Sequence, residues 1–223
     1  EYCCVLVQYP DYYGEITEIT KPADTTLIVA ANLSALAIIK PPVKADMVVG
    51  DIQPLGISME FGGPHAGYMA CKEAYMRQMP GRLVGKTLDA DGKTAYTLTI
   101  QTREQHIKRE KATSNICSNQ SLIALSATLY LSLMGEQGFK ETAVMSANMA
   151  HALSKMLNGK GVRTMNKNFY NEFVVEVEDA DKYLAKLKEA NILGGIKLDD
   201  RRVLVCVTEM NTEEEILDYI EAL

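Results

Sequence analysis

Short, uninterrupted apolar runs mark the first third of the chain, and each one ends at a polar residue or a turn. The first stops at Tyr9 and Pro10, the second at Asn32 and the third at Gly50. Continuous apolar runs of this length are typical of strands buried in a parallel sheet. We therefore expect an α/β sheet whose ligand lies beyond the carboxyl ends of the strands. The four predicted strands are residues 3–8, 27–31, 46–49 and 68–71.

The middle of the chain carries helical patterns. Residues 121–134 are apolar on nearly every side, which predicts a buried helix, and residues 140–157 predict a second long helix. Gly135 and Gly138 lie between the two predicted helices and are expected to separate them. Two further elements precede these helices: a short helix at 72–79 and a hairpin turned at 89–92.

The last part of the chain alternates strand and helix. Thr212 followed three residues later by Glu215 forms a capping box, which predicts where the final helix begins. We therefore expect two domains: a large α/β domain at 1–135, and a small α+β domain with its linking helix at 136–223. The elements predicted for the small domain are strands at 172–177 and 203–207 and helices at 180–190 and 212–223.

Composition and charge restrict the classes of function. The 223 residues carry a formal net charge of −6, which argues against binding to nucleic acid or to a membrane surface. No apolar run reaches the roughly 18 residues of a membrane span. The cysteines form no Cys-x-x-Cys pair and the histidines share no metal-ligand spacing, so no metal site is expected. Reduced cysteines predict a cytoplasmic protein.

Residues 101–119 concentrate chemistry that a plain linker lacks. Arg103, His106 and Arg109 lie there with two lysines and two glutamates, and a Thr-Ser-Asn triplet follows at 113–115. Guanidinium, imidazole and hydroxyl groups in one segment favour contact with an anion or with a partner's active site.

Four motifs along the chain resemble the glycine cleavage system P-protein family, that is, glycine dehydrogenase (decarboxylating), and within it subunit 1, the alpha or N-terminal half. The motifs are Met79-Pro-Gly-Arg-Leu-Val-Gly85, Gln101-Thr-Arg-Glu-Gln-His106, Arg109-Glu-Lys-Ala-Thr-Ser-Asn-Ile-Cys117 and Asn171-Glu-Phe-Val-Val175. The resemblance implies the aspartate-aminotransferase-like fold of type I enzymes that use pyridoxal phosphate (PLP). It implies a large domain that is incomplete at its N-terminus, followed by a small C-terminal α+β domain.

The resemblance also implies partners and a reaction. The chain would work in a heterotetramer with subunit 2, the beta subunit, which carries PLP, and with the lipoyl carrier H-protein. The substrate would be glycine, which is decarboxylated while its aminomethyl group passes to the lipoyl arm. The chain would be inactive by itself.

Two positions argue that this chain does not tether the coenzyme. A PLP enzyme needs a lysine for the Schiff base and an acid against the pyridine nitrogen. Alignment with the sister subunit on the turn Gly63-Pro-His-Ala-Gly67 places Gln53 at the lysine position, and Asn32 stands at the expected aspartate position. Glutamine forms no imine, and a neutral amide does not stabilise a pyridinium as a carboxylate does. Other lysines do not follow a strand in a small-residue loop: Lys40, Lys44, Lys72 and Lys111.

The polar triplet and the basic residues before it are candidates for a contact in trans. Thr113, Ser114 and Asn115 would donate hydrogen bonds to the phosphate of the partner's PLP. Arg103 or His106 would meet the glycine carboxylate, the phosphate or an acid of the beta subunit. The alternative is that the triplet caps the following helix and that the arginines form ion pairs at an interface.

Three functions compete at this stage. The first is a subunit that completes the PLP site of a beta subunit. The second is a non-catalytic structural or regulatory partner, which stabilises the beta subunit or docks the lipoyl protein. The third is an autonomous PLP enzyme acting as a homodimer, and Gln53 and Asn32 argue against it.

Overall fold

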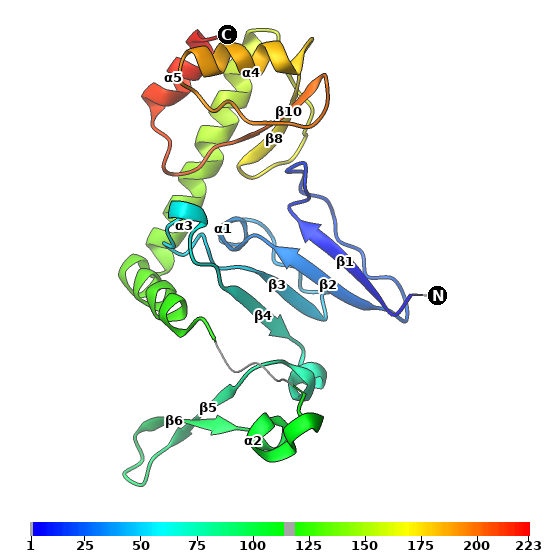
Figure 1. Ribbon diagram of the computed structural model, residues 1–223, viewed down its shortest axis with the longest axis vertical. Helices are drawn as coiled ribbons and strands as arrows, with labels where there is room; N and C mark the ends of the chain where they lie inside the picture. The colour runs from blue at the N-terminus through cyan, green and yellow to red at the C-terminus, as the bar shows by residue number, and fades with distance from the viewer. Residues whose placement is uncertain (1, 114–118) are drawn as a thin grey trace. The chain divides into compact units, whose positions relative to one another are not determined.

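Figure 1 shows the computed structural model, which describes residues 2–113 and 119–223. The chain divides into two compact units, one made of Glu1–Met69 with Ile123–Leu223 and the other of Ala70–Leu122. This division follows spatial contacts and separates the middle segment from the rest. The domain boundary between 135 and 136 stays a prediction.

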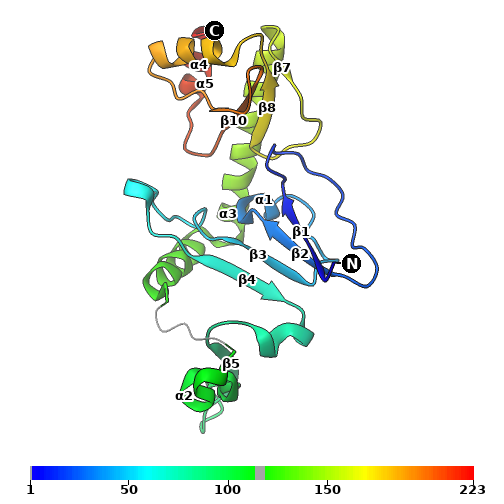
Figure 2. The same ribbon diagram turned by 45° about the vertical axis from the view of Figure 1, so that its right-hand side comes forward.

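A four-stranded sheet opens the first unit, and all four predicted strands are confirmed (Figure 2). Its strands stand in the order β1 (Cys4–Tyr9), β2 (Thr26–Ala31), β3 (Met47–Asp51) and β4 (Gly67–Cys71). β1, β2 and β3 run parallel, with Tyr9 opposite Ala31. The carboxyl ends of these strands therefore lie at one edge of the sheet, as the pattern predicts.

Only one face of this sheet is well covered. Leu27, Val29 and Ala31 of β2 are buried and pack with Tyr9 and Ala45. On β1 burial alternates, and the side chain of Leu6 is 66% exposed. A parallel strand that reads as continuously apolar is normally covered on both faces, whereas the described residues cover the second face of this sheet only in part.

The long helix α3 (Ser121–Gly159) covers both predicted helices of the middle of the chain. Gly135 interrupts it with φ 63° and ψ −177°, which confirms the break expected there, whereas Gly138 lies within the helix and does not end it. The expectation that 121–134 is buried is wrong. Ile123 and Ala127 are buried, but Leu125, Leu129 and Leu133 are 55%, 56% and 87% exposed. An all-round apolar sequence does not say which of its faces the rest of the chain covers.

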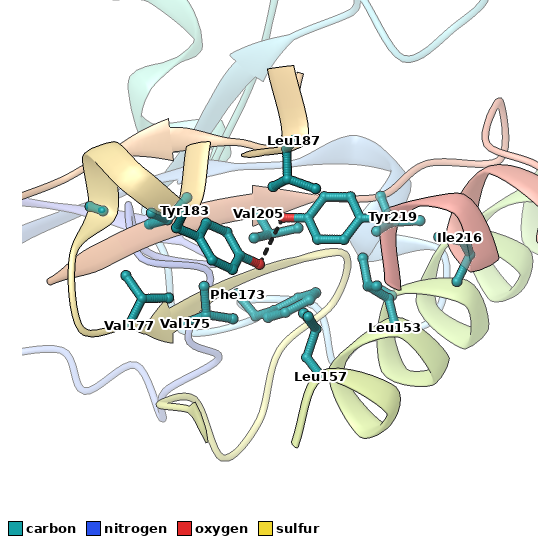
Figure 3. Packing of buried hydrophobic residues seen from close by; sticks show 14 of the residues in the cluster. Leu153, Leu157, Phe173, Val175, Val177, Tyr183, Leu187, Val205, Ile216 and Tyr219 are labelled. Carbon is teal, nitrogen blue, oxygen red and sulfur yellow. Dashed lines mark hydrogen bonds between the residues drawn. The ribbon is translucent and has the colours of Figure 1, made fainter. Parts of the chain in front are cut away.

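The C-terminal part confirms the predicted order of strand and helix. An antiparallel sheet in the order β7-β8-β10-β9 carries two helices, and its core joins both helices to α3 (Figure 3). The two longer strands and both helices were predicted, while the two-residue edge strands were missed. The elements are β7 (Arg163–Thr164), β8 (Glu172–Glu176), α4 (Ala180–Glu189), β9 (Ile196–Lys197), β10 (Arg202–Cys206) and α5 (Glu213–Glu221).

The capping box of the last helix is present. The Thr212 hydroxyl accepts from the Glu215 N–H at 3.2 Å, and the Thr212 N–H donates to the Glu215 carboxylate at 2.9 Å. Both partners satisfy an N–H that the first turn of a helix leaves unpaired, which is why this boundary is readable from sequence.

The second unit contains a hairpin and several short helical turns. β5 (Leu83–Leu88) pairs antiparallel with β6 (Thr94–Thr99) around the predicted turn at 89–92, where the Gly92 N–H donates to the Asp89 carbonyl at 3.1 Å. The predicted helix at 72–79 is instead a 3₁₀ helix, η2 (Glu73–Gln78). The polar stretch folds into η3 (Gln101–Arg103), α2 (Gln105–Lys108) and η4 (Arg109–Lys111).

Among the residues that the structure describes, no helix has the length and apolar character that crossing a bilayer requires.

Candidate functional site

A cleft of about 430 Å³ lies at the carboxyl ends of β1, β2 and β3, where the sequence places the ligand site. Asn32 and Gln53 both line it, so the two positions singled out from sequence share one cavity. The opposite wall comes from the start of β8. The lining residues are Gln8, Tyr9, Pro10, Gly14, Ala30, Ala31, Asn32, Gly50, Asp51, Gln53, Pro54, His65, Asn171 and Glu172.

The side chain of Gln53 is hydrogen-bonded to the backbone of its own loop. Its Nε2 donates to the carbonyl oxygens of Ile57 and Ser58, both at 2.9 Å. Its Oε1 is buried and receives no hydrogen bond from the described residues. Gly63 packs against the same loop with φ 55°, and a Cβ there would collide with the Ser58 carbonyl. The glycine at 63 therefore serves a tight connection around Gln53.

Asn32 acts as a helix cap. It is the N-cap of α1 (Leu33–Leu36), and its Oδ1 accepts from the Ala35 N–H at 3.1 Å. The amide oxygen is therefore engaged with backbone, which is the common use of asparagine at this position.

The charge of the cleft is unusual for an anion site. Among the described residues that line it there is no lysine or arginine, while Asp51 and Glu172 supply two carboxylates. His65 Nδ1 lies 3.6 Å from Asp51 Oδ2. Burial raises the pKa of the Glu172 carboxyl above its ordinary value, because no cation compensates the loss of water. The two carboxylates repel a phosphate, and no described lysine or arginine of the lining offsets them.

Contacts that the sequence analysis did not predict join the segment after β1 to residues 167–168, which precede the second wall of the cleft. The Glu15 carboxylate accepts from the backbone N–H groups of Lys167 and Asn168, at 3.1 and 3.0 Å. The Ile16 N–H donates to the Asn168 carbonyl at 2.8 Å, and the backbone of Gly14 lies directly against that of Glu172. We call these contacts the Glu15 latch. No local pattern signals them, because the partners lie 152 and 153 positions apart.

In the second unit Arg103 is buried, with 4% of its surface exposed. Its two terminal nitrogens donate to the carbonyl oxygens of Met79 and Gly81, so the guanidinium holds the turn of the Met79–Gly85 motif. Glu104 is also buried, with Arg82 Nε and His106 Nδ1 each 3.7 Å from its Oε2. The side chains of the adjacent residues Arg103 and Glu104 therefore both lie in the interior of this unit.

The remaining predicted residues of this segment are exposed or lie outside the described residues. His106 is exposed and near Glu104. Thr113 is exposed, and its backbone N–H donates to the Arg103 carbonyl at 3.1 Å. Ser114 and Asn115 lie outside the described residues. Elsewhere in the described chain, no group of three or more His, Cys, Asp or Glu is placed to hold a metal ion.

Comparison with known proteins identifies the family. Residues 1–223 match the family model of the glycine cleavage system P-protein. The chain belongs to this family. A P-protein relative from Exiguobacterium sibiricum, a probable glycine dehydrogenase (decarboxylating) subunit 1, is 45% identical over 99% of this chain and 53% of its own length. The chain spans about half the length of the curated relatives that it matches.

Solved structures agree with the family and with the fold. A crystal structure of glycine decarboxylase (P-protein), in inhibitor-bound form, superposes with a TM-score of 0.87 at 38% identity, covering 98% of this chain and 54% of that one. A C-DES mutant with glycine linked to its PLP cofactor has a TM-score of 0.63 at 14% identity, over 98% of this chain and 59% of that one, and shows the fold alone. This P-protein family member therefore has the type I fold of PLP enzymes.

The residues of the cleft do not fit a tethered PLP in this P-protein chain. The position expected to carry the Schiff-base lysine holds Gln53, whose amide donates hydrogen bonds to two backbone carbonyls. The position expected to carry the aspartate holds Asn32, which caps α1. No described lysine or arginine lines the cleft to pair with the phosphate.

Proposed function

We propose that this chain is part of the non-tethering subunit 1 of a glycine dehydrogenase (decarboxylating), and that a beta subunit binds PLP. The observation that carries the proposal is the state of the cleft: Gln53 and Asn32 are hydrogen-bonded to backbone groups, and no lysine or arginine is among the described residues that line it. The names of the relatives support the reaction, because they are glycine dehydrogenase subunits.

In this proposal the assembly decarboxylates glycine and transfers the aminomethyl group to the lipoyl H-protein. This chain contributes donors in trans to the phosphate held by the beta subunit: Thr113, Ser114 and Asn115. His106 is the better placed of the two substrate candidates, because it is exposed whereas the Arg103 guanidinium is bonded within its own unit. The chain has no turnover without the beta subunit.

Borohydride trapping tests the central claim. The chain is reconstituted with a beta subunit and PLP, reduced with borohydride, digested and examined by peptide mass spectrometry. We expect the pyridoxyl group on a lysine of the beta subunit and on none of this chain. A pyridoxyl adduct on any lysine of this chain would overturn the proposal.

Thr113→Ala tests the contact in trans. A hydrogen bond from a hydroxyl to a phosphate contributes about 1.5–3 kcal/mol, so the variant should weaken the affinity of the complex for PLP about tenfold or more. Thr94→Ala is the matched control, because Thr94 is an exposed threonine of the same unit, on the hairpin. Equal PLP affinity and turnover in both variants would remove Thr113 from the site.

A non-catalytic role for this segment is the second candidate, and the buried Arg103 favours it. Arg103→Lys keeps the charge but cannot reach both loop carbonyls with one ammonium group. If Arg103 is structural, the variant lowers the melting temperature of the complex and leaves KM for glycine unchanged. If Arg103 meets the glycine carboxylate, KM rises while the melting temperature holds.

A further inference from the structure

A groove of about 760 Å³ on the C-terminal part has no role in the proposed function. It runs between α4 and the ends of β7 and β8, far along the chain from the cleft residues of β1 to β3. Its lining residues are Lys160, Gly161, Val162, Arg163, Glu176, Val177, Glu178, Asp179, Lys182, Tyr183, Lys186, Arg201 and Leu223.

The groove is basic in an acidic chain. It gathers five basic side chains against three acidic ones, while the whole chain has a formal net charge of −6. Local excess charge of this kind concentrates anions from solution. We call the five side chains the groove cations: Lys160, Arg163, Lys182, Lys186 and Arg201.

Two of the groove cations compete for one carboxylate. Arg163 Nε lies 3.1 Å from Glu176 Oε2, and Arg201 Nη2 lies 4.0 Å from Glu176 Oε1. The side chains of both arginines are about two-thirds exposed, at 67% and 66%. One glutamate cannot saturate two guanidinium groups, each of which has five donors, so donors of both arginines remain for a ligand.

The lysines of the groove are only partly engaged. Lys182 Nζ lies 3.5 Å from Asp179 Oδ2, and Lys186 Nζ donates to the Leu223 carbonyl at 3.2 Å. Lys160 has no ion pair among the described residues. An ammonium group has three donors, so each of these lysines retains capacity for another acceptor.

We propose that this groove binds a small polyphosphate anion, held by Arg163 and Arg201 with lysine support. Arginine pairs bind phosphate through parallel N–H donors, and a ligand with two or more negative charges can engage both arginines at once. The site is independent of the PLP question, because none of its residues lines the cleft.

Titration with inorganic pyrophosphate by calorimetry tests the proposal on the whole chain. We expect saturable binding that weakens as salt is added. Arg163→Gln combined with Arg201→Gln should weaken it about tenfold or more, because the bidentate donors are lost. Lys188→Gln is the matched control: it removes one cation from α4 outside the groove lining and should leave binding unchanged.

Glu176→Gln provides a test in the opposite direction. It removes the carboxylate that competes for both arginines, so pyrophosphate should bind about fivefold more tightly. Damage to the fold would weaken binding and could not produce this gain. Absence of saturable binding, equal loss in the Lys188→Gln control, or equally tight binding of citrate would each overturn the assignment.

Discussion

The tyrosine pair in the C-terminal core makes a sharp prediction about stability. Tyr219 on α5 and Tyr183 on α4 are each 7% exposed, and their hydroxyl oxygens lie 3.1 Å apart (Figure 3). The Tyr219 hydroxyl donates to the Gly194 carbonyl at 2.6 Å. Because that proton is used, the hydrogen bond between the tyrosines must be donated by Tyr183. The two hydroxyls therefore have unequal roles.

Tyr219→Phe breaks both hydrogen bonds and leaves a carbonyl and a hydroxyl unpaired in the core. At about 1 kcal/mol for each bond, with a further penalty for the unpaired groups, the loss of unfolding free energy is about 2–4 kcal/mol. Tyr183→Phe removes one bond and leaves the Gly194 carbonyl satisfied, so its loss is about 1 kcal/mol. In the double variant the orphaned Tyr183 hydroxyl is gone, so it should be no less stable than Tyr219→Phe.

Urea unfolding followed by far-ultraviolet circular dichroism measures all three variants against the parent chain. The order of stabilities is the decisive result. If Tyr183→Phe destabilises the chain as much as Tyr219→Phe, the assigned direction of the two hydrogen bonds is wrong.

Three further predictions concern the pH response, the latch and the glycine turn. Burial raises the pKa of Tyr183 from 10.0 to about 12, so between these pH values the folded chain holds a proton that the unfolded chain releases. The free energy of unfolding should therefore fall by up to about 1.4 kcal/mol per pH unit between pH 10 and 12. Urea unfolding of Tyr183→Phe should show a weaker dependence of this free energy on pH. Glu15→Ala leaves two N–H groups without their carboxylate and should lower the free energy of unfolding by about 1–3 kcal/mol, with Glu15→Gln intermediate. Amide hydrogen exchange at Lys167 and Asn168 should become faster in Glu15→Ala, and unchanged exchange would contradict the latch. Gly63→Ala should lower the melting temperature more than Gly62→Ala, because both have positive φ but only the former meets a neighbouring carbonyl; equal losses would count against this packing.

Sequence patterns were sufficient where local chemistry determines the structure. The apolar runs before Tyr9, Asn32 and Gly50 predicted three parallel strands, because buried strands leave a continuous apolar signature. Thr212 and Glu215 fixed a helix start, since the hydrogen bonds that define it join residues three apart. The resemblance to PLP enzymes singled out Asn32 and Gln53 as positions of one coenzyme site, and both line one cleft at the carboxyl ends of the parallel strands.

Prediction failed where distant segments determine the outcome. The leucines at 125, 129 and 133 have the composition of a buried helix, but burial depends on what packs beside it, which a local window does not contain. The sequence of the polar stretch could not show that the Arg103 guanidinium would turn to the carbonyls of Met79 and Gly81, more than 20 residues earlier.

The Glu15 latch also has a consequence for biosynthesis. Its carboxylate joins the N-terminal strands to a turn more than 150 residues later. At typical elongation rates of about 5–20 residues per second, Glu15 waits roughly 8–30 s on the ribosome before its partners are made. During that interval the nascent sheet has no second wall, so the cleft closes only after residues 167–172 have been made.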